Sequence, residues 1–151
     1  MRTFTSPEQV KSAVGEVLEP GPWLEIDQQR VNTFADATND HQWIHVDPVR
    51  AASGPFGAPI AHGYLTLSLV PGLGEKVLAF DTPGPKINYG LNKVRFPSPV
   101  PVGSRLRLKS EILSAEDTPN GVLVTVKNVV EIEDSERPAC VVESLILLLN
   151  A

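Results

Sequence analysis

A short polar segment carries the side chains best suited to catalysis. Residues 40–45, Asp-His-Gln-Trp-Ile-His, place one carboxylate and two imidazoles within six positions. An imidazole has an unperturbed pKa of about 6.5, so it can donate or accept a proton at neutral pH. A carboxylate and an imidazole that converge on one water molecule can position it and move its protons, which hydration of an activated alkene requires. Asp40 and His45 are therefore the candidate catalytic pair, although polar loops also carry Asp and His for structural reasons.

The residues around this pair resemble a family signature. The run from Phe34 to His45, followed by Ala51, is similar to the signature of hydratase 2 and the MaoC-like dehydratases, in which Asp40 and His45 occupy the catalytic positions. The resemblance implies an α+β hot dog fold, in which a curved antiparallel sheet wraps a long central helix, as a homodimer. The implied activity is that of an (R)-specific enoyl-CoA hydratase of fatty acid metabolism, which needs no cofactor because the thioester already polarises the alkene.

Four residues depart from the signature. Ala37 stands at a usually aliphatic position, Asn39 replaces a glycine, and Gln42-Trp43 replaces Asn-Pro. In the family this asparagine helps to hold the catalytic water, and Gln42 offers the same amide one methylene further out. A branch of the family close to nodulation protein N is similar over nearly the whole length and includes Asp-His-Gln-Trp-Ile-His itself. The departures therefore resemble a subfamily trait.

Two further segments carry the resemblance. Ala61-His62-Gly63-Tyr64 opens an apolar stretch, and in the family the matching glycine presents its N–H to the thioester carbonyl. The N-terminus of a helix has free N–H donors that stabilise a developing oxyanion. The alternative is that Gly63 only allows close helix packing.

The second segment, residues 88–100, resembles the family's second conserved strand and the turn after it. We expect His62, Asn92, Lys93 and Arg95 to contact the substrate, with the two cations at the phosphates of CoA or of an acyl-carrier-protein arm. The alternative for these cations is a solvated strand face.

Three other functions remain open on the sequence alone. A hot dog thioesterase would attack the carbonyl carbon instead of C3. A non-catalytic subunit would bind acyl thioesters without Asp40 and His45 reacting. A metal enzyme is the third, because His41 and His45 are four residues apart and Asp36 and His62 are available. Two histidines four residues apart face one ion only if they lie on a regular helix. Asn39 and the β-branched Ile44 disfavour a helix there, so we expect no metal.

Composition restricts the partners and the compartment. The 151 residues suit one domain, residues 1–151, and the net charge of −5 disfavours nucleic acid. Cys140, the single cysteine, excludes an internal disulfide and is expected to be buried. The chain shows neither a signal peptide nor about 20 consecutive apolar residues, so a cytoplasmic protein without membrane contact is expected.

The first half of the sequence predicts helices and loops. A helix should run from Ser6 to about Leu18, and a second from residue 28 to about 38 behind an Asp27 cap. Residues 39–47 should be irregular, and Asp47-Pro48 should begin a short helix. The apolar stretch 61–70 predicts a helix that is buried on all sides and is kinked or ended by Pro71-Gly72.

The second half alternates apolar and polar residues with the period of strands. We expect strands at residues 86–96, from about 105, at 122–132 and at 139–149, with a turn at Pro119-Asn120-Gly121 between the second and third. The last segment is apolar on both faces and should be internal to the sheet. Residues 86–96 and 139–149 carry more apolar surface than one helix covers, which also predicts a homodimer.

Overall fold

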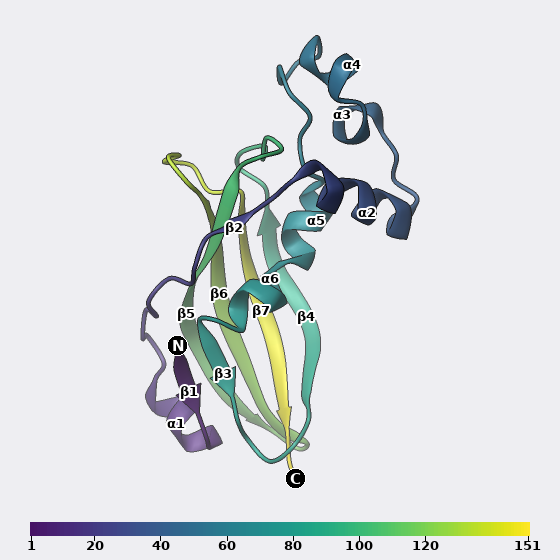
Figure 1. Cartoon of the computed structure of the whole chain (residues 1–151). Coiled ribbons are helices and arrows are strands. Elements are labelled where there is room, and N and C mark those ends of the chain that lie inside the picture. Colours follow the sequence, from purple (N-terminus) through teal and green to yellow (C-terminus); the bar gives the residue numbers. More distant parts are fainter.

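The computed structural model describes all 151 residues and is built on a five-stranded antiparallel sheet. Its strand order is β2 (Leu24–Glu25), β5 (Arg105–Thr118), β6 (Gly121–Ile132), β7 (Cys140–Leu149) and β4 (Lys86–Arg95). The long strands curve, and helices α5 and α6 lie against one face of the sheet (Figure 1). The predicted α+β architecture and the four long strands are confirmed, and β7 is internal to the sheet as expected.

The central helix is shorter than predicted. It comprises α5 (Gly63–Ser68) and α6 (Val70–Gly74), with a break at Leu69. Pro71 does not end it, because Pro71 lies in the first turn of α6, where its missing N–H breaks no helical hydrogen bond. Burial on all sides is also wrong for the single chain, since Tyr64 is 72% exposed.

The core consists of two clusters of buried apolar side chains on the inner face of the sheet. The first lies beneath α5 and α6, where Leu65 and Leu73 pack with residues of β5, β6 and β7 such as Leu108. The second lies at the other end of the sheet and includes Phe4 and Leu148. Along β5, β6 and β7 the inward side chains alternate with outward ones, as the period of two predicts.

The first half of the chain supplies short elements around this core. α1 (Pro7–Ser12) begins at the Ser6 cap but ends before the predicted Leu18, because the chain turns at Gly15 and then bonds along β5. α2 (Gln28–Thr38) and α4 (Pro48–Ala52) follow the prediction, whereas α3 (Trp43–Val46) lies in a stretch expected to be irregular. The short strands β1 (Arg2–Phe4), β2 and β3 (Leu78–Phe80) were not predicted.

No helix of the structure combines the length and the apolar character that crossing a bilayer requires. Cys140 is buried as predicted, and burial raises the pKa of its thiol to about 11.

Candidate active site

Asp40 is positioned by the end of α2. Asn39, the C-cap of this helix, has φ 60° and ψ 24°, a left-handed conformation that favours glycine and that asparagine tolerates better than most residues. The signature that the sequence resembles has a glycine here, so Asn39 satisfies the same backbone requirement. The chain leaves the helix abruptly at this turn, and the exposed Asp40 carboxylate accepts a hydrogen bond from the Gln42 N–H at 3.4 Å.

His45 lies on α3 with only 7% of its surface exposed. Its Nδ1 is 2.6 Å from the backbone carbonyl of Ile60. A carbonyl can only accept, so Nδ1 carries the hydrogen and the neutral ring keeps its lone pair on Nε2. Gln28 of α2 holds the same turn from the other side, because its side-chain amide donates to the His45 carbonyl at 2.8 Å. The ring is therefore fixed with a basic nitrogen available.

His62, the N-cap of α5, is 2% exposed and connects the other components of the site. Its Nε2 donates to the backbone carbonyl of Asp40 at 2.9 Å. The ring stacks on His45 with 3.9 Å between centroids, and Phe34 of α2 packs on it at 5.0 Å. Its Nδ1 is buried without a hydrogen-bond partner in the chain. His62 therefore orders both members of the candidate pair.

The three side chains converge. One donor or acceptor atom from each of Asp40, His45 and His62 lies within 4.8 Å of the other two. Two hydrogen bonds of about 2.8 Å span such a separation, so one water molecule can bridge a carboxylate oxygen and an imidazole nitrogen. Burial is the main reason that the pKa of His45 lies below its ordinary value, and the nearby His62 imidazole lowers it further. The hydrogen bond to Ile60 and the Asp40 carboxylate each raise this pKa, but by less than burial lowers it.

The same group offers one carboxylate and two imidazoles, and each imidazole has one ring nitrogen free for a proton or an ion. The rings of His45 and His62 lie in nearly parallel planes, inclined by 24°. One nitrogen of each ring is already bonded to a backbone carbonyl. His41, the other imidazole of the motif, is exposed and pairs with Asp36 at 2.8 Å, outside this group.

Gly63 is the first residue of α5, where a backbone N–H has no partner within the helix. A Cβ at this position would lie 3.3 Å from the ring of Phe96, which follows β4. The structure thus supports the packing reason for this glycine, and the open N–H remains compatible with the catalytic one.

The remaining predicted residues are exposed. Gln42 makes no side-chain hydrogen bond. Asn92, Lys93 and Arg95 lie on the edge strand β4, with the Lys93 ammonium 3.8 Å from Glu143 and the Arg95 guanidinium bonded to a neighbouring carbonyl. No hydrogen bond or ion pair joins these three to the Asp40–His45 pair.

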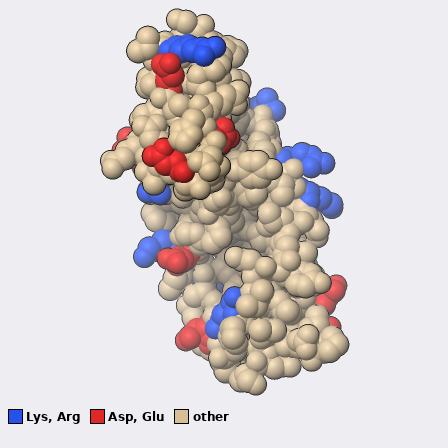
Figure 2. Space-filling model, turned by 90° about the vertical axis from the view of Figure 1, so that its right-hand side faces the viewer, with Lys and Arg blue, Asp and Glu red and all other residues tan.

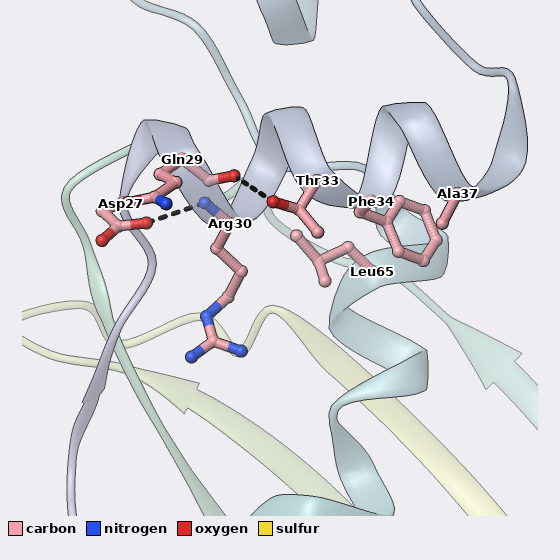
Figure 3. Close-up of a pocket in the computed structure, with 7 residues that line it drawn as sticks. All are labelled: Asp27, Gln29, Arg30, Thr33, Phe34, Ala37 and Leu65. Carbon is pink, nitrogen blue, oxygen red and sulfur yellow. Dashed lines mark hydrogen bonds between the residues drawn. The ribbon is translucent and has the colours of Figure 1, made fainter.

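A shallow pocket beneath α2 adjoins the site, because Phe34 contributes to its wall and also packs on His62. The Arg30 guanidinium extends from α2 toward this pocket and makes no hydrogen bond or ion pair in the chain (Figure 3). The pocket has a volume of about 460 Å³, and its lining residues are Asp27, Gln29, Arg30, Thr33, Phe34, Ala37 and Leu65. Neither Arg30 nor the Ile60 carbonyl was predicted, because one arginine on a helix and one backbone oxygen give no sequence signal.

Comparisons with known proteins agree with the geometry. The model of the MaoC-like domain family matches residues 9–133. The 3-hydroxyacyl-thioester dehydratase Z of Mycobacterium tuberculosis (strain ATCC 25618 / H37Rv) is 54% identical over 147 residues, which cover 97% of each chain. Nodulation protein N of Rhizobium leguminosarum bv. viciae is 46% identical over 135 residues, covering 86% of this chain and 83% of that one.

Among solved structures, the unliganded R-hydratase from Pseudomonas aeruginosa is similar with a TM-score of 0.73 at 27% identity. The match covers 91% of this chain and 83% of the hydratase. The chain thus has the hot dog fold that the sequence resemblance implied, with a shorter central helix than expected.

The environment of His45 predicts its titration. Because burial lowers its pKa, NMR of the ring should give a midpoint below 6.5, so the neutral form persists into mildly acidic solution. His62→Gln removes the second imidazole while its amide can still bond the Asp40 carbonyl, and the midpoint should then move to higher pH. A wild-type midpoint at or above 6.5, or a downward shift in the variant, would contradict this assignment of causes.

Proposed function

Because the chain belongs to the MaoC-like dehydratase family, we propose that it catalyses the reversible hydration of trans-2-enoyl-CoA to (R)-3-hydroxyacyl-CoA. Its family and its 54% identity to a 3-hydroxyacyl-thioester dehydratase make it a hydro-lyase. The observation that carries the finer proposal is the convergence of Asp40, His45 and His62 within 4.8 Å. This group can hold one water molecule against an alkene.

In this proposal the water lies between the Asp40 carboxylate and His45 Nε2. Nε2 is the candidate acceptor of the water proton because Nδ1 donates to the Ile60 carbonyl. The water oxygen bonds to C3, the alkene electrons move toward the thioester carbonyl, and C2 receives a proton from the Asp40–His45 pair. One water is consumed and both catalytic groups return to their starting protonation states.

The free N–H of Gly63 is the proposed donor to the thioester oxygen, on which negative charge develops during addition. No cofactor enters the scheme. His62 is assigned as a positioning residue, because its Nε2 hydrogen bond and its stacking act on Asp40 and His45. The substrate contact expected of His62 from the sequence stays a prediction beside this role.

The acyl chain is proposed to extend along the central helix into a cavity of about 470 Å³ between α6, β3 and the sheet. This volume lies in the range of small-ligand sites. Val70, the nearest lining residue of the helix, is seven positions from Gly63, which corresponds to about 10 Å of helix. Apolar side chains dominate the walls, namely Val70, Pro71, Leu78, Phe80, Leu108, Val126 and Ile146.

The CoA or carrier-protein end is proposed to lie at the mouth of the site. Asn92, Lys93 and Arg95 remain candidates for its polar and phosphate groups, and the unpaired Arg30 adds a second approach from α2. Phe96, which directly follows β4, lies close to Gly63, so the end of β4 with Lys93 and Arg95 is near the N-terminus of α5.

A homodimer is the proposed assembly. β4 pairs only with β7, so its other edge is open, and its apolar side chains Ile87, Tyr89 and Leu91 are exposed. The face that runs along β4 carries few charged side chains across its middle (Figure 2). An open edge with exposed apolar residues is a typical surface for pairing with a second copy. Tyr64 of α5, also exposed, adds to the surface that a partner can cover.

The catalytic pair can be tested with crotonyl-CoA. Asp40→Asn and His45→Gln should each lower the hydration rate by a factor on the order of 10² to 10⁴, the usual contribution of a general acid or base. His41→Gln is the matched control, since it removes an exposed imidazole from the same segment and should keep the wild-type rate. The readouts are loss of the enone absorbance and chiral analysis of the product.

Near-native rates in either catalytic variant would remove that residue from the mechanism. Release of free CoA thiol in place of 3-hydroxyacyl-CoA would identify a thioesterase, and an (S) product would overturn the stereochemical part of the proposal.

Gln42 can be tested separately because its side chain has no partner in the chain. If its amide holds the water, Gln42→Ala should reduce kcat more than it raises KM, whereas Gln42→Asn should retain substantial activity. Equal and negligible effects of the two substitutions would show that the amide role in the family is not used here.

The assembly can be measured by analytical ultracentrifugation at micromolar concentration, where the protein should sediment as a dimer. Tyr89→Lys on β4 should shift the equilibrium toward monomer, because it places a charge where an apolar side chain is exposed. An active wild-type monomer at this concentration would exclude the dimer as the working form.

A further inference from the structure

The inner face of the sheet contains a row of polar side chains that the proposed reaction does not use. Ser110 of β5 lies opposite Asn128 of β6, and Ser144 of β7 is the diagonal neighbour of Asn128, within hydrogen-bond distance of its amide. Ser110 and Asn128 are 1% and 4% exposed, and their inward neighbours along the strands are apolar. The row lies between the two core clusters, because Leu108 and Val142 belong to the first, and Ile112 and Val126 to the second.

The hydrogen bonds of this row run in one direction. The Ser110 hydroxyl is 2.6 Å from the Asn128 side-chain oxygen and donates to it. The Asn128 amide in turn donates to the Ser144 hydroxyl oxygen at 3.0 Å. The Ser144 hydrogen has no acceptor in the chain, so the row ends in a free donor. A buried row of this kind costs desolvation that apolar residues would avoid.

The free end of the row lies at the proposed acyl cavity. Asn128 and Ser144 both line it, and so does Asn88 of β4, whose side chain makes no hydrogen bond in the chain. The sheet side of the cavity therefore combines the hydrogen-bonding groups of Asn88, Asn128 and Ser144 with apolar side chains. A plain hydrocarbon chain would leave these groups unsatisfied or bridged only by water.

We propose that the Ser110–Asn128–Ser144 row selects acyl thioesters whose chain carries a neutral oxygen, a hydroxyl or keto group, at the depth of this cavity. The inference rests on the proposed function, since it names the substrate class of that site. The Ser144 hydroxyl donates to the substrate oxygen, and the Asn88 amide is its second partner.

One cation and one anion line the cavity, so its charges give a carboxylate no net attraction. Lys86 is the only cation in the lining, and its ammonium is held by the Thr82 carbonyl at 2.5 Å. Glu75, the other charged lining residue, would repel an anion. An uncharged oxygen uses the donors of the row without this repulsion.

Binding to the Asp40→Asn protein tests the inference without turnover. The probes are octanoyl-CoA and its 6-, 7- and 8-hydroxy derivatives. Isothermal titration calorimetry measures the dissociation constant of each. At least one hydroxy derivative should bind on the order of tenfold more tightly than octanoyl-CoA, since a site built for a hydroxyl discriminates against analogues that lack it. Equal or weaker binding of all three would overturn the inference.

Ser144→Ala in the same background should remove the preference while the protein keeps its thermal unfolding midpoint within a few degrees of the parent. The matched control is Ser114→Ala, which removes a hydroxyl from β5 opposite Thr125 on the outer face and should keep the preference. A preference that survives Ser144→Ala would overturn the role of the row.

The hydration reaction and the preference for hydroxy-acyl chains are measured in separate experiments. Crotonyl-CoA is too short to reach the row, so its hydration by the wild-type protein reports the proposed function alone. Hydration of crotonyl-CoA without a hydroxy-acyl preference refutes the selection and leaves the reaction standing. A hydroxy-acyl preference without hydration refutes the reaction and supports the row as a ligand-binding element.

Discussion

The site depends on two hydrogen bonds that tie distant segments to each other. His45 of α3 donates to the Ile60 carbonyl, and His62 donates back to the Asp40 carbonyl. The two rings then stack, so each segment fixes the side chain of the other. Such a reciprocal arrangement costs little reorganisation during reaction, because the polar groups are already oriented before substrate arrives.

This pair of bonds is anchored to the sheet. Ile60 also donates its N–H to the Ile44 carbonyl and bridges to Pro101, and Ala61 donates to the Val100 carbonyl. The segment that enters α5 is thus bonded to the catalytic segment on one side and to the residues before β5 on the other. The loop before α3 would otherwise be free to move, and these backbone bonds give it the rigidity that a catalytic pair requires.

The inner face of the sheet carries both the apolar core and the polar row proposed to select the substrate. Most of its inward residues form the two apolar clusters, while the Ser110–Asn128–Ser144 row interrupts them beneath the cavity. The interruption is tolerated because every buried polar atom of Ser110 and Asn128 has a partner within the row. The open edge of β4 and the exposed Tyr64 lie outside both clusters, where a second subunit can cover them.

The sequence by itself determined the elements whose signals are local. The alternation of β5 and β6, the Asp27 cap of α2 and the end of α2 near Thr38 depend on side-chain size and backbone preference at each position. The motif with Asp40 and His45 could also be found, because its spacing is short and matches the family.

Only the tertiary structure decided what depends on contacts between segments far apart in the chain. The end of α1 before Leu18 follows from hydrogen bonds with β5, and the helix continues past Pro71 because the break at Leu69 places Pro71 in the first turn of α6. His62 carries no sign in the sequence that its ring bonds the Asp40 carbonyl, 22 residues earlier. Likewise, Ser110, Asn128 and Ser144 are isolated polar residues in three separate strands. They become one row only because antiparallel register places Asn128 opposite Ser110 and diagonal to Ser144, and register is fixed by the sheet as a whole.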